Sequence, residues 1–307
     1  MQNGSVRNGH IKIPIDLTEM NGDLGPDPDI GSGSTGGKLG VFPVDRRKTL
    51  LALVLVVGAW LANDIVVAWI HDRVPNQSDP LPDVWFSLFA EYTFMIKLTE
   101  TFIVLCVVIG FAVMLLHEHR WIVMRRIFII IALVYIGRAI CILVTQVPVP
   151  SRKTYCGPKV NSTGLRVMLQ RVAHMFSILG LDFQGRVLCG DLIYSGHTCT
   201  LMIGHLTVNQ YTSRRYRKVL SWLTYCAAMF GMIAILFARK HYTIDVILAY
   251  YASTRIFYLY HALVEQHIRN RGRGQPTILS NLIWYKLFLY MEEDIRDPIP
   301  NNFRLSR

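Results

Sequence analysis

The sequence predicts an all-α integral membrane protein with six membrane-crossing helices. Of its 307 residues, 52% are hydrophobic and only 17% are charged. The mean hydropathy is +0.32 although the first 45 residues are mostly polar. A helix needs about 20 apolar residues to cross the hydrocarbon core of a bilayer. Six apolar segments meet this requirement: 49–70, 93–116, 127–147, 192–211, 219–238 and 243–263.

The chain divides into three parts by composition. Residues 1–45 are rich in Gly, Ser, Pro and Asp, so they bury too little apolar surface to offset the entropy of ordering, and we expect a disordered cytosolic tail. Residues 46–263 form the six-helix transmembrane domain, which carries the candidate catalytic residues. Residues 264–307 form a cytosolic C-terminal tail, in which polar residues interrupt the apolar stretch 278–293 and predict an interfacial amphipathic helix, not a seventh span.

Basic residues predict the orientation of the chain. The net charge of +11 by itself would suit nucleic acid, but the basic residues fall in short clusters between apolar segments, which indicates membrane topology and no nucleic-acid binding. On the side of the membrane that holds the termini, thirteen Lys and Arg lie in short segments that flank the helices. On the opposite side there are nine, six of which lie in one loop of over 40 residues. This excess predicts that both termini are cytosolic. The thirteen are Arg46, Arg47, Lys48, Arg120, Arg125, Arg126, Arg214, Arg215, Arg217, Lys218, Arg269, Arg271 and Arg273.

The two loops predicted to be luminal carry features of that compartment. Each contains an Asn-x-Ser/Thr triplet, at 76–78 and 161–163, as a glycan acceptor requires. A third triplet at 3–5 lies in the predicted cytosolic tail, so this support is weak. Cys156 and Cys189 bracket the long luminal loop, where they form either a disulfide or two unpaired thiols.

Two polar stretches, 189–198 and 241–246, open the fourth and sixth segments at the same predicted luminal depth. Ionisable side chains are tolerated near a membrane interface and costly at its centre. His241 and Asp245 are four residues apart, so on a helix their Cβ atoms lie about 6 Å apart and the carboxylate can hold one imidazole nitrogen. Such a pair alone is usually structural. His197, at the same depth on another segment, makes a catalytic role the stronger hypothesis.

Two imidazoles and one carboxylate suit phosphoryl transfer from a lipid. One imidazole attacks phosphorus, and the other protonates the departing oxygen. Transfer to water would make the protein a phosphatase, and transfer to a lipid hydroxyl would make it a synthase. The sequence shows no metal-ligand cluster and no C-x-x-C pair, so we expect neither metal nor cofactor.

These stretches resemble the two signature blocks of the sphingomyelin synthase family, which belongs to the lipid phosphate phosphatase superfamily. The resemblance covers about residues 45–303. The matching blocks are Cys189-Gly190-Asp191 with Ser195-Gly196-His197-Thr198, and His241-Tyr242-Thr243-Ile244-Asp245-Val246 with Ala249-Tyr250-Tyr251 and Thr254-Arg255. Further similarity lies in Arg125-Arg126, Tyr135, Arg138, Val147-Pro148-Val149-Pro150, His71-Asp72-Arg73-Val74-Pro75 and Pro298-Ile299-Pro300.

The resemblance implies a lipid phosphate phosphatase-like core that moves a phosphorylated head group from a glycerophospholipid to the primary hydroxyl of ceramide and releases diacylglycerol. With phosphatidylcholine as donor, the product is sphingomyelin. The resemblance makes His197, His241 and Asp245 the catalytic triad, with His241 as nucleophile, Asp245 orienting it, and His197 as acid and then base. It also implies a site on the luminal or extracellular leaflet of the Golgi or plasma membrane, and it leaves a homo-oligomer open.

Four more residues are predicted to bind substrate. Arg138 lies inside the third segment, about 14 Å from its luminal end, where an arginine either binds the lipid phosphate or forms a structural ion pair with Asp64 as a candidate partner. Asp191 either caps the fourth helix or acts near the head group. Ser195 and Tyr242, within the two blocks, complete the set.

Head-group choice stays open at this point. Arg239 and Lys240 stand where the family commonly has His followed by an acidic residue, although the second block is nearer the phosphocholine branch. The ethanolamine branch with an N-terminal SAM domain is disfavoured, because residues 1–45 are too short and polar to form one. A lipid phosphate phosphatase would usually show a Lys-x6-Arg-Pro block, which the sequence lacks. A transporter would not need two luminal histidines, and the sequence shows no inverted repeat.

Overall fold

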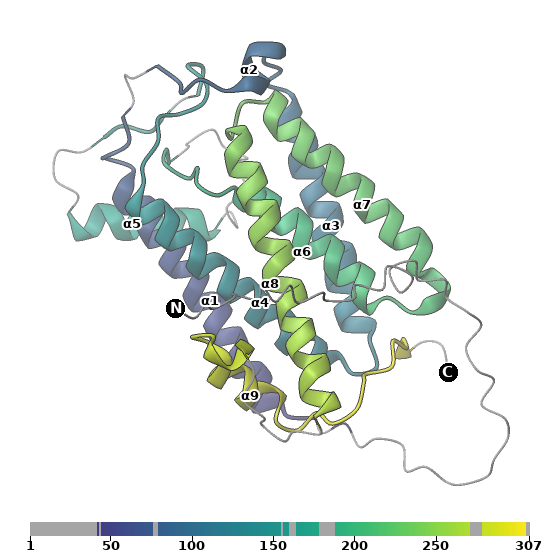
Figure 1. Cartoon of the computed structure of the whole chain (residues 1–307). Helices are drawn as coiled ribbons and strands as arrows, with labels where there is room; N and C mark the ends of the chain where they lie inside the picture. Colours follow the sequence, from purple (N-terminus) through teal and green to yellow (C-terminus); the bar gives the residue numbers. More distant parts are fainter. Residues whose placement is uncertain are drawn as a thin grey trace, which may run out of the picture. The chain divides into compact units, whose positions relative to one another are not determined.

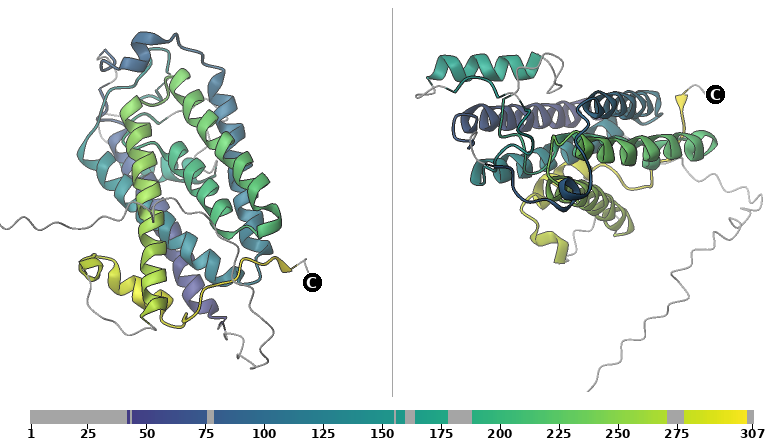
Figure 2. Two further views of the ribbon diagram at one scale, coloured as in Figure 1. Left: turned by 45° about the vertical axis from the view of Figure 1, so that its right-hand side comes forward. Right: turned by 90° about the horizontal axis from the view of Figure 1, so that it is seen from above.

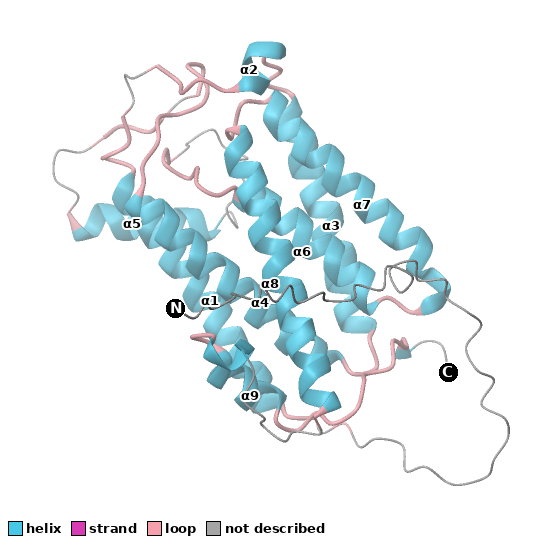
Figure 3. Cartoon of the chain, in the orientation of Figure 1, coloured by secondary structure: helices cyan, strands magenta, loops and turns pink. Residues whose placement is uncertain are grey.

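The computed structural model describes residues 42, 44–75, 79–154, 156–159, 164–177, 188–270 and 278–304. Within these ranges the regular structure is helical and contains no strand, only one isolated β-bridge between His117 and Phe303 (Figure 3). The all-α prediction is confirmed. The tail predicted at 1–45, apart from residues 42, 44 and 45, and both triplets at 76–78 and 161–163 lie outside the described residues.

Six long helices stand where the six apolar segments were predicted. They are α1 (Arg46–Ile70), α3 (Met95–Leu116), α4 (Arg120–Val144), α6 (Gly196–Tyr211), α7 (Arg214–Phe237) and α8 (Thr243–Arg269). By length and composition, α1, α3, α4 and α7 are apolar enough to cross a membrane. The helix α6 has only 16 residues, and α8 does not meet the same criterion, so the count of six crossings stays a prediction.

Side chains at the helix starts explain where three of these helices begin. The carboxylate of Asp45 accepts hydrogen bonds from two backbone N–H groups of the first turn of α1. The Ser195 hydroxyl accepts from the backbone N–H of Thr198 at 3.3 Å and caps α6. At α8, the backbone N–H of Tyr242 donates to Oδ2 of Asp245 at 3.0 Å. Each contact satisfies a backbone donor that a helix start leaves without an intrahelical partner.

The helices form one bundle around a shared apolar core (Figure 1). The helix α1 packs along α4, while α6 lies among α3, α7 and α8. Large apolar side chains also remain on the outer faces of the bundle, such as Val219 and Trp222 on α7, which are 72% and 67% exposed. An exposed apolar surface of this kind is expected where helices contact acyl chains instead of water.

Two helices in the loops were not predicted from the sequence. They are α2 (Val84–Leu88) and α5 (Leu165–Ser177), both too short to register as membrane spans. Seen from above, α5 lies outside α1 (Figure 2), and Arg171 joins the two through a bidentate ion pair with Asp72 at 2.8 and 3.0 Å. A disulfide between Cys156 and Cys189 closes the same region, so of the two alternatives for these cysteines the disulfide is confirmed.

The C-terminal segment contains the helix predicted within 278–293. The structure divides this stretch into a 3-10 turn, η2 (Ile278–Asn281), and α9 (Tyr285–Glu292). One face of α9 buries Phe288, Met291 and Glu292. The helix therefore docks onto the bundle through its apolar face and through one buried carboxylate.

Candidate active site

The two predicted catalytic histidines meet at the N-terminal ends of α6 and α8. The ring centroids of His197 and His241 lie 5.6 Å apart, with 66° between the ring planes. His241 and Asp245 are both buried, and His197 is half-buried. Residues more than 40 positions apart in the chain thus place two imidazoles and one carboxylate in a single cluster.

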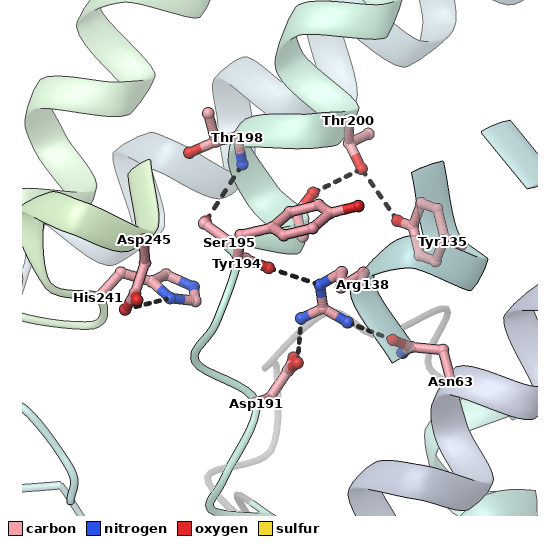
Figure 4. Close-up of polar contacts among 11 residues, drawn as sticks. Asn63, Tyr135, Arg138, Asp191, Tyr194, Ser195, Thr198, Thr200, His241 and Asp245 are labelled. Carbon is pink, nitrogen blue, oxygen red and sulfur yellow. Dashed lines mark hydrogen bonds and ion pairs between the residues drawn. The ribbon is translucent and has the colours of Figure 1, made fainter. Parts of the chain in front are cut away.

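The carboxylate of Asp245 lies beside the ring of His241. Its Oδ2 lies 3.7 Å from Nδ1 of His241 (Figure 4). The same oxygen accepts from the backbone N–H of Tyr242 at 3.0 Å. The imidazole contact is longer than a hydrogen bond. Among the described residues, Oδ1 of Asp245 and Nδ1 of His241 have no hydrogen-bond partner. Because Nδ1 faces the carboxylate, Nε2 lies on the opposite edge of the ring.

Ser195 connects the two helices that carry the histidines. Its backbone N–H donates to the carbonyl oxygen of Asp245 at 3.3 Å, and its hydroxyl caps α6 directly before His197. The alternative that Asp191 caps this helix is therefore wrong, because the chain turns into the helix four residues later than predicted. Nε2 of His197 is buried and has no partner among the described residues.

Arg138 organises a second polar group beside the histidines (Figure 4). Its Nε donates to the carbonyl oxygen of Tyr194 at 2.7 Å, its Nη1 donates to Oδ1 of Asn63 at 2.6 Å, and its Nη2 forms an ion pair with Asp191. The candidate partner Asp64 is thus wrong. The adjacent residue Asn63 contacts the guanidinium, and the segment before α6 supplies the carboxylate.

Gly196 allows Arg138 to approach the start of α6. A Cβ atom at this position would lie 3.2 Å from Cζ of Arg138, so a larger residue would push the guanidinium away. Burial by itself would raise the pKa of Asp191, but the Arg138 guanidinium outweighs it and lowers this pKa below its usual range. Asp191 is therefore an ionised carboxylate at neutral pH, and its side chain keeps 36% exposure.

Tyr242 is buried and joins three segments of the chain. Its hydroxyl donates to the carbonyl oxygen of Pro148 at 3.1 Å and accepts from the backbone N–H of Leu81 at 3.0 Å. Beside it, Asp83 accepts from both the backbone N–H and the hydroxyl of Thr243, each at 2.8 Å. The sequence interpretation missed Asp83, although an Asp before an apolar stretch is a recognisable cap signal.

Arg239 fixes the loop that covers this end of the bundle. Its Nη2 donates to the carbonyl oxygens of Phe86 and Phe89 at 2.9 and 3.1 Å, at the end of α2. Arg239, the first of the two residues that depart from the family pattern before the second block, thus contacts loop backbone. Among the described residues, no three His, Cys, Asp or Glu side chains are placed to hold a metal ion.

Comparison with known proteins agrees with this geometry. Residues 188–262, which include both histidines and Asp245, match the family described as PAP2 superfamily C-terminal. The chain is 43% identical over 238 residues to sphingomyelin synthase-related 2 of Caenorhabditis elegans, which covers 77% of this chain and 72% of the relative. The chain belongs to the sphingomyelin synthase family.

Other relatives in the sphingomyelin synthase family carry a more specific name. The chain is 37% identical over 268 residues to phosphatidylcholine:ceramide cholinephosphotransferase 1 of Caenorhabditis elegans, and 30% identical over 265 residues to the human protein of that name. Each alignment covers 85% of this chain, and 56% and 63% of these two relatives. The chain therefore spans less than two thirds of both of these cholinephosphotransferases.

Proposed function

We propose that this protein transfers phosphocholine from phosphatidylcholine to the primary hydroxyl of ceramide, which yields sphingomyelin and diacylglycerol. The observation that carries the proposal is the pairing of His197 and His241 beside Asp245. The names of its relatives, phosphatidylcholine:ceramide cholinephosphotransferase, support the choice of substrates.

In the proposed mechanism, Nε2 of His241 attacks the phosphorus of phosphatidylcholine, and the bond from phosphorus to the glycerol oxygen breaks. His197 gives its proton to that oxygen, and diacylglycerol leaves. The primary hydroxyl of ceramide then attacks the phosphohistidine, His197 takes the hydroxyl proton, and the phosphorus–nitrogen bond breaks. Asp245 stabilises the positive imidazole of His241 in both steps. A ring spacing of 5.6 Å lets one phosphate group contact both imidazoles.

We assign the substrate's two charges to Arg138 and Asp191. The side chain of Arg138 is only 2% exposed, but its guanidinium carries five N–H donors, of which the contacts to Tyr194, Asn63 and Asp191 use three, so two remain for a phosphate oxygen. The ionised and partly exposed carboxylate of Asp191 suits a cationic head group. Ethanolamine as head group is the alternative, since it carries the same charge. Ser195 and Tyr242 would then act by holding the site, because the hydroxyl of each is already bonded to the protein backbone.

The proposed reaction takes place on the luminal or extracellular leaflet of the Golgi or plasma membrane, with both termini in the cytosol. The disulfide between Cys156 and Cys189 supports this side, because such bonds persist in oxidising compartments and Cys189 lies two residues before Asp191. A homo-oligomer stays a prediction that cross-linking in intact membranes would test.

Fluorescent ceramide supplied to membranes that contain the protein tests the proposal. We expect a phosphocholine product from phosphatidylcholine, and we expect His197→Ala and His241→Ala each to lower its formation at least 1,000-fold, on the order of catalytic-residue losses elsewhere. His119→Ala, at the other end of the bundle, is the matched control and should keep full activity. A phosphoethanolamine product would favour the alternative head group, and phosphate released from phosphatidate would favour a phosphatase. Full activity in either catalytic variant would contradict the assignment.

A further inference from the structure

A second polar pair lies one helical turn deeper than the catalytic residues. Tyr135 on α4 precedes Arg138 by three residues, and Thr200 on α6 follows His197 by three residues. The hydroxyls of Tyr135 and Thr200 lie 3.3 Å apart (Figure 4). The two helices run in opposite directions past each other, so both hydroxyls are displaced in the same direction, by about 4.5 Å along the helix axes.

The hydrogen-bonding capacity of this pair is only partly used. The Thr200 hydroxyl donates to the carbonyl oxygen of Gly196 at 3.0 Å, so it can only accept from Tyr135. The contact between the two hydroxyls is long for an O–H to oxygen hydrogen bond. Among the described residues, no group donates to the phenolic oxygen of Tyr135, because its contact with Thr200 uses the phenolic hydrogen. The phenolic oxygen can therefore accept a further hydrogen bond.

The pair keeps part of its surface exposed although it lies next to the buried Arg138. Tyr135 and Thr200 are both half-buried, although α6 lies within the bundle. The helix α6 packs closely on α3, α7 and α8 and less closely on α4. The two side chains point toward each other from α4 and α6, next to Arg138 (Figure 4). Both side chains therefore keep some exposed surface beside Arg138, one helical turn below His197.

The chemistry of the acceptor lipid matches this second layer. In ceramide, the amide and the secondary hydroxyl lie one and two carbons from the reacting primary hydroxyl, which places them roughly 3–4 Å deeper at ordinary bond lengths. We propose that Tyr135 and Thr200 form a hydrogen-bonding subsite for this polar backbone of the acceptor, with the phenolic oxygen of Tyr135 accepting from the amide N–H or the secondary hydroxyl. The inference rests on the proposed function and deepens it.

Such a subsite discriminates between lipids. At the same depth, the backbone of a diacyl lipid has ester oxygens. These oxygens accept hydrogen bonds but cannot donate them. When only a substrate N–H or O–H can donate to an acceptor in the site, an analogue without that donor leaves the acceptor unpaired. The analogue therefore binds less tightly. The subsite would therefore favour ceramide over diacylglycerol as acceptor, although both have a primary hydroxyl.

Two reactions of the full-length protein in phosphatidylcholine membranes separate this role from catalysis in general. One is transfer to ceramide. The other is exchange of labelled diacylglycerol into phosphatidylcholine, which uses the same triad without ceramide. We expect Tyr135→Phe and Thr200→Val each to lower kcat/KM for ceramide about 10-fold, the loss of roughly one hydrogen bond, and to change the exchange rate less than twofold. Thr200→Ser, which keeps the hydroxyl, should restore transfer.

A ceramide with a methylated amide nitrogen sharpens the test. We expect it to be a poorer acceptor for the wild type, and methylation should have a smaller effect in Tyr135→Phe, because the partner atom is already absent. Tyr258→Phe, on a 52% exposed side chain of α8, is the matched control and should leave both reactions unchanged.

The outcomes separate the two claims. Wild-type protein that exchanges diacylglycerol but forms no phosphorylated ceramide would contradict the proposed function. If the wild type forms that product, then equal losses in both reactions for Tyr135→Phe, or no loss in either, would overturn the subsite alone.

Discussion

Two fully buried carboxylates, at opposite ends of the bundle, have very different surroundings. Glu292 on α9 has both oxygens satisfied: Nε of Arg126 donates to each at 3.1 Å, Nη2 adds a contact at 2.7 Å, and the hydroxyl of Tyr260 donates at 3.1 Å. Asp245 has one oxygen at 3.7 Å from His241, and its other oxygen has no partner among the described residues.

The difference separates a carboxylate that holds the fold from one that is available for chemistry. Burial acts to raise the pKa of Glu292, but Arg126 outweighs it and lowers this pKa below its usual range, so the carboxylate is charged and fully paired. An incompletely bonded buried carboxylate is costly, and such groups persist where a substrate or a transition state supplies the missing interaction. Arg125, near Glu292, also has nitrogens without a partner in the described part of the chain, so the two ends differ in their carboxylates and not in every polar group.

The largest effect is expected from Asp245→Asn. An amide keeps the shape of the side chain but cannot stabilise a positive imidazole, so transfer to ceramide should fall about 1,000- to 10,000-fold, by comparison with a serine protease triad. The midpoint of thermal unfolding in detergent should change little. Glu265→Gln, on the exposed side of the same helix, is the control and should retain activity. Near-normal transfer by Asp245→Asn would show that the carboxylate of Asp245 has no role in the proposed mechanism.

Next in size is the effect of Glu292→Ala on stability. Removing one partner of a buried ion pair leaves the other charge unpaired, which costs about 3–5 kcal/mol. We expect the variant to unfold at a lower temperature, while the activity of each folded molecule stays the same. Glu293→Ala, at a 70% exposed neighbour, should change neither property. A catalytic defect in the folded Glu292→Ala variant would contradict the view that Glu292 contributes only to stability.

The smallest effect concerns pH and the contacts of His71. The backbone N–H of Cys189 donates to Nδ1 of His71 at 2.9 Å, and Nε2 lies 3.2 Å from the carbonyl oxygen of Gly157. These contacts require a neutral ring. Burial and then Arg171 lower the pKa of His71, although Asp72 opposes them.

Because the unfolded chain binds the His71 proton more readily, this contribution is complete above the ordinary pKa of 6.5 and is lost as pH falls below it. The midpoint of unfolding should therefore drop between pH 7.5 and 5.5, and it should drop less in His71→Gln. Buried His117, whose pKa burial lowers to about 4, contributes in the same direction and is unchanged in the variant. Equal pH dependence in both proteins would show that His71 is not responsible.

The sequence by itself determined the helices and the catalytic candidates. Long apolar runs and local caps depend only on neighbouring residues, so each predicted segment overlaps an observed helix, with boundaries that differ by at most seven residues. His241 and Asp245 are four residues apart, so their proximity is equally local and was predicted from the sequence. The prediction that they share a helix face is wrong, because α8 begins at Thr243 and His241 precedes its N-cap Tyr242. His197 was added because both stretches start at the same predicted membrane depth, and the structure brings its ring next to that of His241.

Contacts between distant segments were decided only by the tertiary structure. Whether Arg138 pairs with Asp64 or Asp191 depends on how α1 and α4 rotate against each other and on the path of the chain before α6, and neither is written in a local pattern. The same holds for Asp83 at the start of α8 and for the meeting of Tyr135 with Thr200. Periodicity fixes which residues share a helix face, whereas side-chain packing and the depth of each helix fix which faces meet.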